Sequence, residues 1–248
     1  MPQLINKLSG IEGLLRIRLS SIEPMYVNDE LIRIVKENPK VCKHLHIPLQ
    51  SGDDKILESM NRNYTSKDFL YMAKAIQKQI KDIAVTTDII VGFPGEDEKA
   101  FKNTCKLVNK IKFSRIHVFS YSDRPGTAAF NFKNKVDSGT IAQRYEKMGK
   151  LRAKYMLKFH RSFKRDPLEV LIEQRDRRTG QLEGLTSNYI RVFLEGLPPE
   201  ARTPAKGGAN SAAAKAGYDT GDDSLGRLIP VRFKGFRVEN VLGAPILV

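Results

Sequence analysis

The sequence predicts an α/β fold with parallel strands, followed by a small β-barrel. Up to Thr127, a strand-like run, a polar or glycine-rich turn and a helical run follow one another about four times, which is typical of parallel sheets with helical crossovers. A long amphipathic stretch then ends at Pro167, and the strand-like runs after it are short. We therefore divide the chain into a partial, TIM-like barrel of parallel strands (1–139), a basic amphipathic helix (140–166) and a β-rich domain (167–248).

The strands and helices expected in residues 1–139 are inferred from the periodicity of apolar residues and from helix-capping residues. Leu15–Ser21 alternates apolar and polar side chains, which predicts a strand. Asn28 is a good N-cap for a helix that runs through Asn38, because Pro39 follows as a terminator. Further strands are expected at 44–49, 83–91 and 116–121, and further helices at 54–60, after a cap at Thr65 or Ser66, and at 98–110.

The turns that end these strands are expected to meet at one rim of the sheet. Parallel strands have their carboxyl ends on the same side, and α/β proteins bind ligands there. Asp88–Glu96 is the clearest case, because an apolar run stops in a Gly-Phe-Pro-Gly-Glu turn before a helix. Gly92 and Gly95 permit positive φ or the close approach of a ligand, and Pro94 rigidifies the corner, although packing alone also produces such turns. The segments placed on this rim are 20–23, 50–53, 92–96 and 120–127.

Two rim positions carry polar groups that suit a ligand. Gln50 and Ser51 could bind ribose hydroxyls, or they could form a turn or a helix cap. Glu96 could accept a hydrogen bond from a ligand, or it could sit at a helix start where a carboxylate is favoured. The sequence has no Ser-His-Asp arrangement, P-loop or Rossmann glycine fingerprint. The small and polar turns therefore indicate a nucleotide-like ligand without naming a reaction.

The histidines are more consistent with hydrogen bonding than with a metal site. His44 and His46 lie two apart on a predicted strand, so both face the same side. A metal site needs at least one more ligand, and His117 and His160 are the only other histidines. We expect His44 and His46 to line the polar interior of the partial barrel.

The stretch Thr140–Asp166 predicts a helix with one apolar and one basic side. Its apolar residues recur three or four positions apart. They are Ile141, Tyr145, Met148, Leu151, Tyr155, Phe159 and Phe163, and the basic residues assigned to the other faces are Arg144, Lys147, Lys150, Lys154, Lys158, Arg161, Lys164 and Arg165. A solvated helix would explain the basic side, but its charge density favours contact with an RNA backbone.

The residues after Pro167 fit a small β-barrel interrupted by a long loop. Short strands are expected at 168–172, 181–186, 189–194, 228–238 and 241–248. The segment 198–224 is rich in Ala, Gly, Pro, Lys and Asp, so it has no apolar face to bury and is expected to be a disordered loop.

Composition points to a polyanionic partner. The chain has 42 Lys and Arg against 28 Asp and Glu, a formal charge of +14, which favours nucleic acid over a basic surface that serves solubility alone. The two cysteines, Cys42 and Cys105, are too far apart for a zinc or iron–sulfur loop and are interpreted as reduced thiols. The apolar runs are too short to span a membrane and no signal peptide follows Met1, so we expect a cytoplasmic protein without a membrane partner.

Four motifs in order are specific enough to identify a family. They are Arg16–Pro24, His44–Gly52, Thr87–Glu96 and His117–Thr127. Together with Met60–Thr65 and the basic β-rich tail, they resemble the tRNA methylthiotransferases, which are radical S-adenosylmethionine enzymes with a C-terminal TRAM domain. The resemblance runs from about Leu4 to the end of the chain, except for the segment 198–224.

The resemblance implies S-adenosylmethionine and 4Fe-4S clusters as cofactors and tRNA as the partner. It places Gln50 and Ser51 near the ribose or methionine part of S-adenosylmethionine, and the turn after residue 91 near its adenine. The implied cofactor-binding residues are Gln50, Ser51, Gly92, Pro94, Gly95, Glu96, Phe119 and Tyr121, with Arg18, Ser20 and Glu23 at the same rim. The implied RNA-binding residues are Lys158, Arg161, Lys164, Arg165, Arg232 and Lys234.

Within the family, two motifs resemble the enzyme that acts on threonylcarbamoyladenosine. These are Leu-Ser-Ser-Ile-Glu-Pro at 19–24 and His-Val-Phe-Ser-Tyr-Ser at 117–122. The implied reaction is methylthiolation of N6-threonylcarbamoyladenosine at adenosine-37 of tRNA, next to the anticodon. Sulfur and electron donors would be further partners.

The cysteine count departs from the family pattern. The family holds its catalytic cluster in a Cys-x-x-x-Cys-x-x-Cys loop after the first barrel strand and a second cluster in an N-terminal domain, and this sequence has neither. We expect the chain to begin in the helix before the third strand, to contain no catalytic cluster ligand and to have no methylthiolation activity alone. The alternative is a non-catalytic RNA-binding protein with a degenerate barrel.

Overall fold

The computed structural model describes residues 1–176, 179–194, 225–236 and 241–245. The chain divides into two compact units. The sheet unit comprises Leu19–Asn38 and Lys43–Met156, and the barrel unit comprises Met1–Arg18, Pro39–Cys42 and Leu157–Val248. The predicted loop 198–224 and the ends of the predicted strands 228–238 and 241–248 lie outside the described residues.

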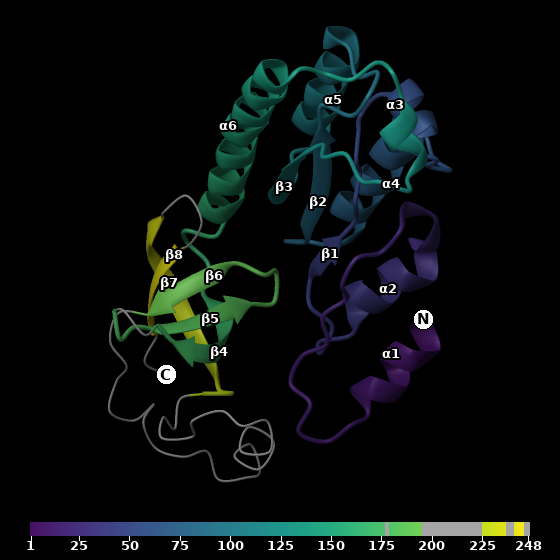
Figure 1. The fold of residues 1–248 in the computed structure, drawn as a ribbon. Coiled ribbons are helices and arrows are strands. Elements are labelled where there is room, and N and C mark those ends of the chain that lie inside the picture. The colour runs from purple at the N-terminus through teal and green to yellow at the C-terminus, as the bar shows by residue number, and fades with distance from the viewer. Residues whose placement is uncertain (177–178, 195–224, 237–240, 246–248) are drawn as a thin grey trace. The chain divides into compact units, whose positions relative to one another are not determined.

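The sheet unit is built on three parallel strands connected by helices (Figure 1). The strands β1 (His44–His46), β2 (Ala84–Val91) and β3 (Arg115–Ser120) lie in the order β1-β2-β3. The helical segments of this unit are η1 (Pro24–Tyr26), α2 (Asp29–Glu37), α3 (Asp54–Ser59), α4 (Ser66–Gln79), α5 (Glu98–Ile111), η2 (Ala128–Asn131) and most of α6 (Ser138–Ser162). The predicted parallel α/β part is therefore confirmed.

The two faces of the central strand differ sharply. Alternate residues of a strand face opposite sides. On one side Val85, Ile89 and Val91 are at most 1% exposed, and each such burial contributes about 1.5–3 kcal/mol to stability. On the other side Asp88 and Ile90 are only half-buried. One face of the sheet thus forms the core, and the other remains accessible.

The helix starts follow the capping residues. The Asn28 side chain accepts a hydrogen bond from the backbone N–H three residues later, at 2.9 Å. Thr65 and Asp68 form a capping box, in which each side chain accepts a hydrogen bond from the other's backbone N–H. Asp97 caps α5 in the same way as Asn28 caps α2. The predicted caps at Asn28 and Thr65 are confirmed.

Two predicted strands are shorter than expected. Leu15–Ser21 does not form a continuous strand and makes only isolated bridges, at Ile17 and at Ser21. The predicted strand 44–49 is reduced to the three residues of β1, since Pro48 has no N–H to donate to a neighbouring strand. Pairing with β2 resumes as a single bridge at Gln50.

The long basic helix also ends earlier than predicted. α6 stops at Ser162, before the predicted end at Asp166. The N–H groups of Phe163 and Lys164 bind carbonyl oxygens three residues back, which tightens the last turn. Asp166 precedes Pro167, and the residue before a proline disfavours the helical conformation.

The barrel unit contains helix α1 (Pro2–Ser9) and a closed five-stranded barrel. The strands are β4 (Leu168–Arg175), β5 (Leu182–Thr186), β6 (Arg191–Leu194), β7 (Leu228–Phe236) and β8 (Val241–Pro245), arranged β4-β5-β6-β8-β7. All neighbours are antiparallel except β6 and β8. Val170, Val192, Val231 and Val241 fill the interior and are 0% exposed. The predicted small β-barrel is confirmed.

No helix in the described part of the chain is long and apolar enough to cross a membrane.

We predict that Gly184→Ala destabilises the barrel. A Cβ atom at this position of β5 would lie 2.2 Å from the carbonyl oxygen of Leu171 and 2.6 Å from a methyl group of Val170. Backbone must shift to relieve this contact, so we expect a loss of roughly 3 kcal/mol in unfolding free energy, measured by urea titration. Gly149→Ala is the matched control, because a Cβ atom at that position would have nothing within 4 Å and a helical alanine is favoured by about 0.5–1 kcal/mol. Equal midpoints for the two variants would contradict the prediction.

Candidate functional site

The accessible face of the parallel sheet is polar. Register places His46 beside Thr86, Asp88 beside His117, and Ile90 beside Phe119. Because residues two apart share a face, all of these side chains lie on the face opposite the apolar core. These side chains, called the row below, carry imidazole, hydroxyl and carboxylate groups at the centre of the face. An aromatic ring lies nearer the carboxyl ends of the strands.

A carboxylate joins two histidines in this row. Asp88 Oδ2 lies 3.2 Å from His46 Nε2, and Asp88 Oδ1 lies 3.4 Å from His117 Nδ1. The Thr86 hydroxyl is shared by His44 Nε2 at 3.1 Å and His46 Nδ1 at 3.0 Å. The prediction that His44 and His46 share one face and form hydrogen bonds there is confirmed.

Burial and the neighbouring Asp88 act in opposite directions on the pKa of His117. Burial lowers the pKa of His117, and the Arg115 guanidinium lowers it further, while Asp88 acts in the opposite direction. His117 is therefore neutral at pH 7 and able to accept a proton. Asp88 Oδ1 is buried 3.4 Å from His117 Nδ1, and it receives no hydrogen bond of good geometry among the described residues.

The turn after β1 is fixed by its backbone. Gln50 has a φ of 65°, its N–H donates to the Asp88 carbonyl at 2.9 Å, and its own carbonyl accepts from Ile90 N–H at 2.9 Å. Ser51 is 0% exposed, with its hydroxyl 3.4 Å from that of Thr104. Gln50 thus lies at the rim. Ser51 is buried and supports the turn through Thr104, so its contact with a ligand stays a prediction.

The turn after β2 is locked by a buried ion pair. Gly92 has a φ of 80°, and its N–H donates to Glu96 Oε2 at 2.7 Å. Arg144 donates to the same oxygen at 2.9 Å and to the Glu96 carbonyl at 2.8 Å. Burial raises the pKa of Glu96, while the Gly92 N–H and Arg144 oppose that rise. Pro94 is buried and Gly95 is exposed, so Gly95 is the part of this turn that a ligand can reach.

Sequence reasoning missed the role of Arg144. Its placement on the solvent side of the helix is wrong, because Arg144 is 6% exposed, while Tyr145 from the predicted apolar side is 44% exposed. Arg144 stands three residues after Ile141 and four before Met148, so the apolar spacing itself contained the signal. A buried arginine is rare unless it is paired, and here its partner is Glu96.

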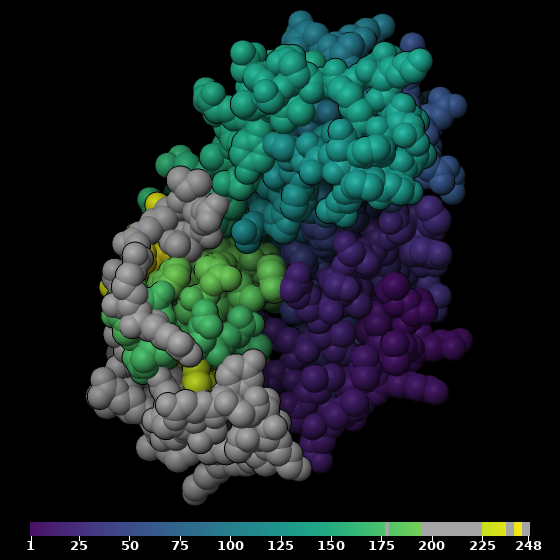
Figure 2. Space-filling view, viewed as in Figure 1, coloured from purple at the N-terminus to yellow at the C-terminus, as the bar shows by residue number. Residues whose placement is uncertain are grey.

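The end of β3 contributes an exposed aromatic ring. Phe119 is 51% exposed, beside the half-buried Ile90. Tyr121 packs edge to face on Phe93 at 5.3 Å and donates to Asp123 at 2.9 Å. The loop that leads from here into α6 forms a continuous part of the surface, drawn in teal (Figure 2).

The motif Met60–Thr65 supports the rim from outside the sheet. Arg62 forms an ion pair with Glu23 at 3.2 Å. The Tyr64 hydroxyl lies 3.2 Å from the carbonyl oxygens of Pro48 and Leu49, and burial raises its pKa to about 12. Glu23, predicted from its motif to face the rim, is therefore held by Arg62.

The residues predicted to bind RNA all lie on the surface of the barrel unit. Lys158 and Arg161 are on α6, and Lys164 and Arg165 follow its end. Arg232 and Lys234 are exposed on β7, where they alternate with the buried Val231 and Phe233.

The residues of the rim fit S-adenosylmethionine, but the cysteines do not fit an iron–sulfur cluster. The Asp88 carboxylate, whose side chain is 22% exposed, suits a cationic ligand, and the exposed Phe119 ring suits an adenine. Cys42 and Cys105 are both buried, burial raises the pKa of both thiols, and they belong to different units. The described residues contain no group of three potential metal ligands.

Comparison with known proteins defines the class. Residues 1–108 match the Radical SAM superfamily. The solved structure of coproporphyrinogen III oxidase from Escherichia coli, described as a radical SAM enzyme, has a TM-score of 0.52 over 62% of this chain and 37% of that chain. At 14% identity this likeness concerns the fold alone. Over residues 1–108 the sequence is similar to the Radical SAM superfamily, and the solved structure supports the parallel α/β fold.

The chain is also similar to curated tRNA-modifying proteins. The tRNA-2-methylthio-N(6)-dimethylallyladenosine synthase of Caldicellulosiruptor saccharolyticus is 40% identical over 184 residues, which cover 74% of this chain and 39% of the relative. The threonylcarbamoyladenosine tRNA methylthiotransferase of Bacillus subtilis is 36% identical over 189 residues, which cover 75% and 42%. The chain spans about two fifths of the length of these relatives. It is a relative of the radical SAM methylthiotransferases.

We predict that Arg144→Met destabilises the sheet unit in a pH-dependent way. The variant leaves the Glu96 carboxylate buried without its cation, which costs about 3 kcal/mol at pH 7. The pKa of Glu96 is already raised by burial, so its charge costs stability as the pH rises through that pKa. The loss is therefore expected to be smaller near pH 4, as measured by urea unfolding at both pH values.

The double variant Glu96→Gln with Arg144→Met is the control for this pair. It removes both charges, so it should recover much of the stability that the single variant loses at pH 7. An equal loss at both pH values, without recovery in the double variant, would show that the ion pair does not hold the turn.

Proposed function

We propose that this chain carries the S-adenosylmethionine-binding and tRNA-binding parts of a cytoplasmic tRNA methylthiotransferase that acts at adenosine-37. The observation that carries the proposal is the convergence of three of the four motifs, His44–Gly52, Thr87–Glu96 and His117–Thr127, on the rim and accessible face of one parallel sheet. Asp88, His117 and Phe119 lie there together. The curated relatives, whose names state tRNA methylthiolation, support the same reaction.

In this proposal the chain binds and orients S-adenosylmethionine and tRNA, and one of its side chains accepts a proton. S-adenosylmethionine would supply the radical chemistry of the class, and the described residues of this chain offer no ligands for the cluster. Phe119 would contact the adenine, Gly95 would let the backbone approach it, and the Asp88 carboxylate would receive a cationic or N–H group of the ligand. Neutral His117, held beside Asp88, accepts a proton released at the rim.

We further propose N6-threonylcarbamoyladenosine as the modified nucleoside. Support comes from the motifs at 19–24 and 117–122, which resemble the enzyme for that nucleoside. The names of the relatives include both this activity and that on dimethylallyladenosine. Binding to tRNA that carries one or the other modification distinguishes the two substrates.

A second candidate function is RNA binding without catalysis. The observation that favours it is the chain's two cysteines, buried in different units, which cannot form the three-cysteine loop of the family. This alternative retains the basic surface of the barrel unit but not a working cofactor site. Binding of S-adenosylmethionine separates the two functions.

For the cofactor site, we expect Phe119→Ala to weaken S-adenosylmethionine binding about three- to tenfold, because a stacked ring contributes about 0.5–1.5 kcal/mol. Equilibrium dialysis with labelled S-adenosylmethionine measures the effect. Tyr71→Ala is the matched control, since Tyr71 is an exposed ring (64%) on α4. Undetectable binding to the unmodified chain, or equal affinity in both variants, would favour the non-catalytic function.

For the RNA surface, we expect four simultaneous changes to glutamine, at Lys158, Arg161, Lys164 and Arg165, to weaken tRNA binding. Losing four phosphate contacts lowers the slope of log affinity against log salt by about 3. Fluorescence anisotropy from about 50 to 200 mM salt measures that slope. The same change at the exposed lysines Lys36, Lys74, Lys78 and Lys81 alters net charge equally, and an identical effect there would exclude a specific surface.

The unmodified chain, the four-residue variant and its lysine control are each titrated with tRNA that bears either threonylcarbamoyladenosine or dimethylallyladenosine. Tighter binding of the first supports the proposed substrate, and tighter binding of the second transfers the proposal to dimethylallyladenosine.

A further inference from the structure

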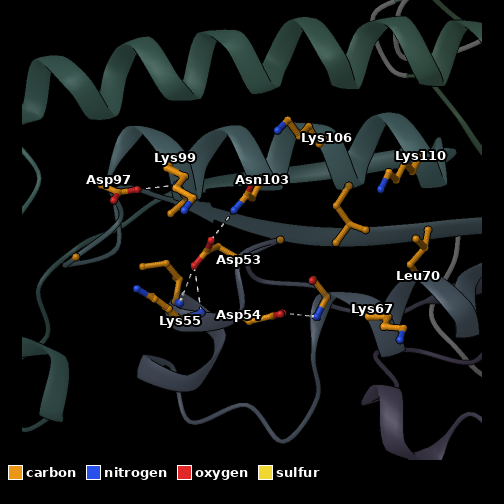
Figure 3. A pocket seen from close by; sticks show the side chains of 16 residues that line it. Asp53, Asp54, Lys55, Lys67, Leu70, Asp97, Lys99, Asn103, Lys106 and Lys110 are labelled. Carbon is orange, nitrogen blue, oxygen red and sulfur yellow. Dashed lines mark hydrogen bonds between the residues drawn. The ribbon is translucent and has the colours of Figure 1, made fainter.

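A cleft outside the polar sheet face is lined by lysines from three helices. It has a volume of about 450 Å³ and lies between α5 on one side and α3 and α4 on the other (Figure 3). Lys99, Lys106 and Lys110 project from α5, while Lys55 and Lys67 come from α3 and α4. None of the four sequence motifs assigned a function to these lysines.

The acidic residues of the cleft are already engaged. Asp53 accepts hydrogen bonds from two backbone N–H groups of α3 and from the Asn103 side chain at 2.8 Å. Asp54 accepts from Ser66 N–H at 2.7 Å, and Asp97 caps α5 (Figure 3). These carboxylates satisfy the backbone at the helix starts, so they are not placed to neutralise the lysines.

The lysines have no such partners. In the part of the chain that the structure describes, none of the five ammonium groups takes part in a hydrogen bond or an ion pair, and only Lys67 has an aromatic neighbour, the Tyr71 ring at 5.8 Å. Lys102, by contrast, forms an ion pair with Glu98 on the same helix. Several unpaired positive charges around one cleft repel one another, and an anion relieves that repulsion.

The spacing of the lysines selects an extended anion. Lys99, Lys106 and Lys110 lie on one side of α5, and the first and last are eleven residues apart, about 16 Å along the helix. A single phosphate cannot contact both ends of such a row, but a chain of phosphates can. The apolar lining consists of Ile56, Leu70, Ala100 and Leu107, so it offers no ring on which a base could stack.

We propose that this cleft, the lysine groove, binds the phosphodiester backbone of an RNA strand without reading its sequence. It is a second RNA contact in addition to the basic surface of the barrel unit. The inference rests on the proposed function only for the identity of the RNA as tRNA, because the lysines and the cleft themselves require no catalysis. Inorganic polyphosphate presents the same repeated phosphate chemistry and is the other source of ligand to be compared.

The test compares charge changes inside and outside the groove in the full chain. Lys99, Lys106 and Lys110 are replaced together by glutamine, and the control variant has the same change at Lys36, Lys78 and Lys81, which are exposed and outside the cleft. We expect the groove variant to bind a labelled 20-nucleotide single-stranded RNA about tenfold more weakly than the control, with a salt slope lower by about 2. Replacing the three groove lysines by arginine should preserve binding, which separates loss of charge from loss of folding.

Three results would overturn the inference. Equal weakening in the groove and control variants means that net charge alone drives binding. A groove variant that loses affinity for inorganic polyphosphate but keeps its affinity for RNA means that the site serves a free polyanion. Loss of binding in the arginine variant means that the lysines act through the fold.

The single-stranded RNA of this test contains no tRNA anticodon loop, so the result is independent of methylthiolation. Weak binding by the groove variant together with no S-adenosylmethionine binding by the unmodified chain would support the groove while contradicting the proposed enzyme function. Unchanged RNA binding together with cofactor binding would do the reverse.

Discussion

The buried ion pair between Glu96 and Arg144 is the interaction on which the candidate site depends. Removing two charges from water is costly, and such pairs contribute little net stability. Their value lies in geometry, because the carboxylate can satisfy both the Gly92 N–H and the guanidinium in only one arrangement. Ile141 packs so closely on Gly92 that a Cβ there would lie 2.3 Å from its side chain. The turn after β2 is consequently fixed to α6 by two hydrogen bonds from Arg144, one of them to the Glu96 carboxylate, and by the close contact of Ile141 with Gly92.

The parallel sheet provides a face on which functional groups can lie next to this fixed turn. Its apolar face takes up the helices, which leaves the opposite face free to carry groups that would be too costly inside a core. Asp88 lies there between two imidazoles, on a face that is only partly covered. Adjacent residues of the same strand therefore have different roles: Ile89 packs in the core and supports stability, whereas Asp88 belongs to the candidate site.

Local signals allowed much of the fold to be predicted, and tertiary partners explain the rest. Asn28 and Thr65 cap helices through neighbours three residues away, so their roles could be recognised without the fold. The spacing of Arg144 from Ile141 and Met148 places it on the buried side of its helix, but its partner Glu96 lies 48 positions away and could not be recognised locally. The burial of Ser51 also depends on Thr104, 53 positions away. The pairing of Leu15–Ser21 likewise depends on distant strands. At the site, the rim and the shared face of His44 and His46 were predictable, whereas the Asp88 bridge to His117 required the register of β2 and β3.

The strand order of the barrel has a consequence for how the protein is made. β8 follows every other strand along the chain, yet it lies between β6 and β7 and pairs with β6 in parallel. Until β8 has been synthesised and inserted, β6 and β7 each keep an open edge, the type of edge through which partly folded chains associate. Closure also joins segments that are distant in sequence, which is slow compared with local folding. A nascent chain of this protein therefore exposes both edges until its last described strand is in place.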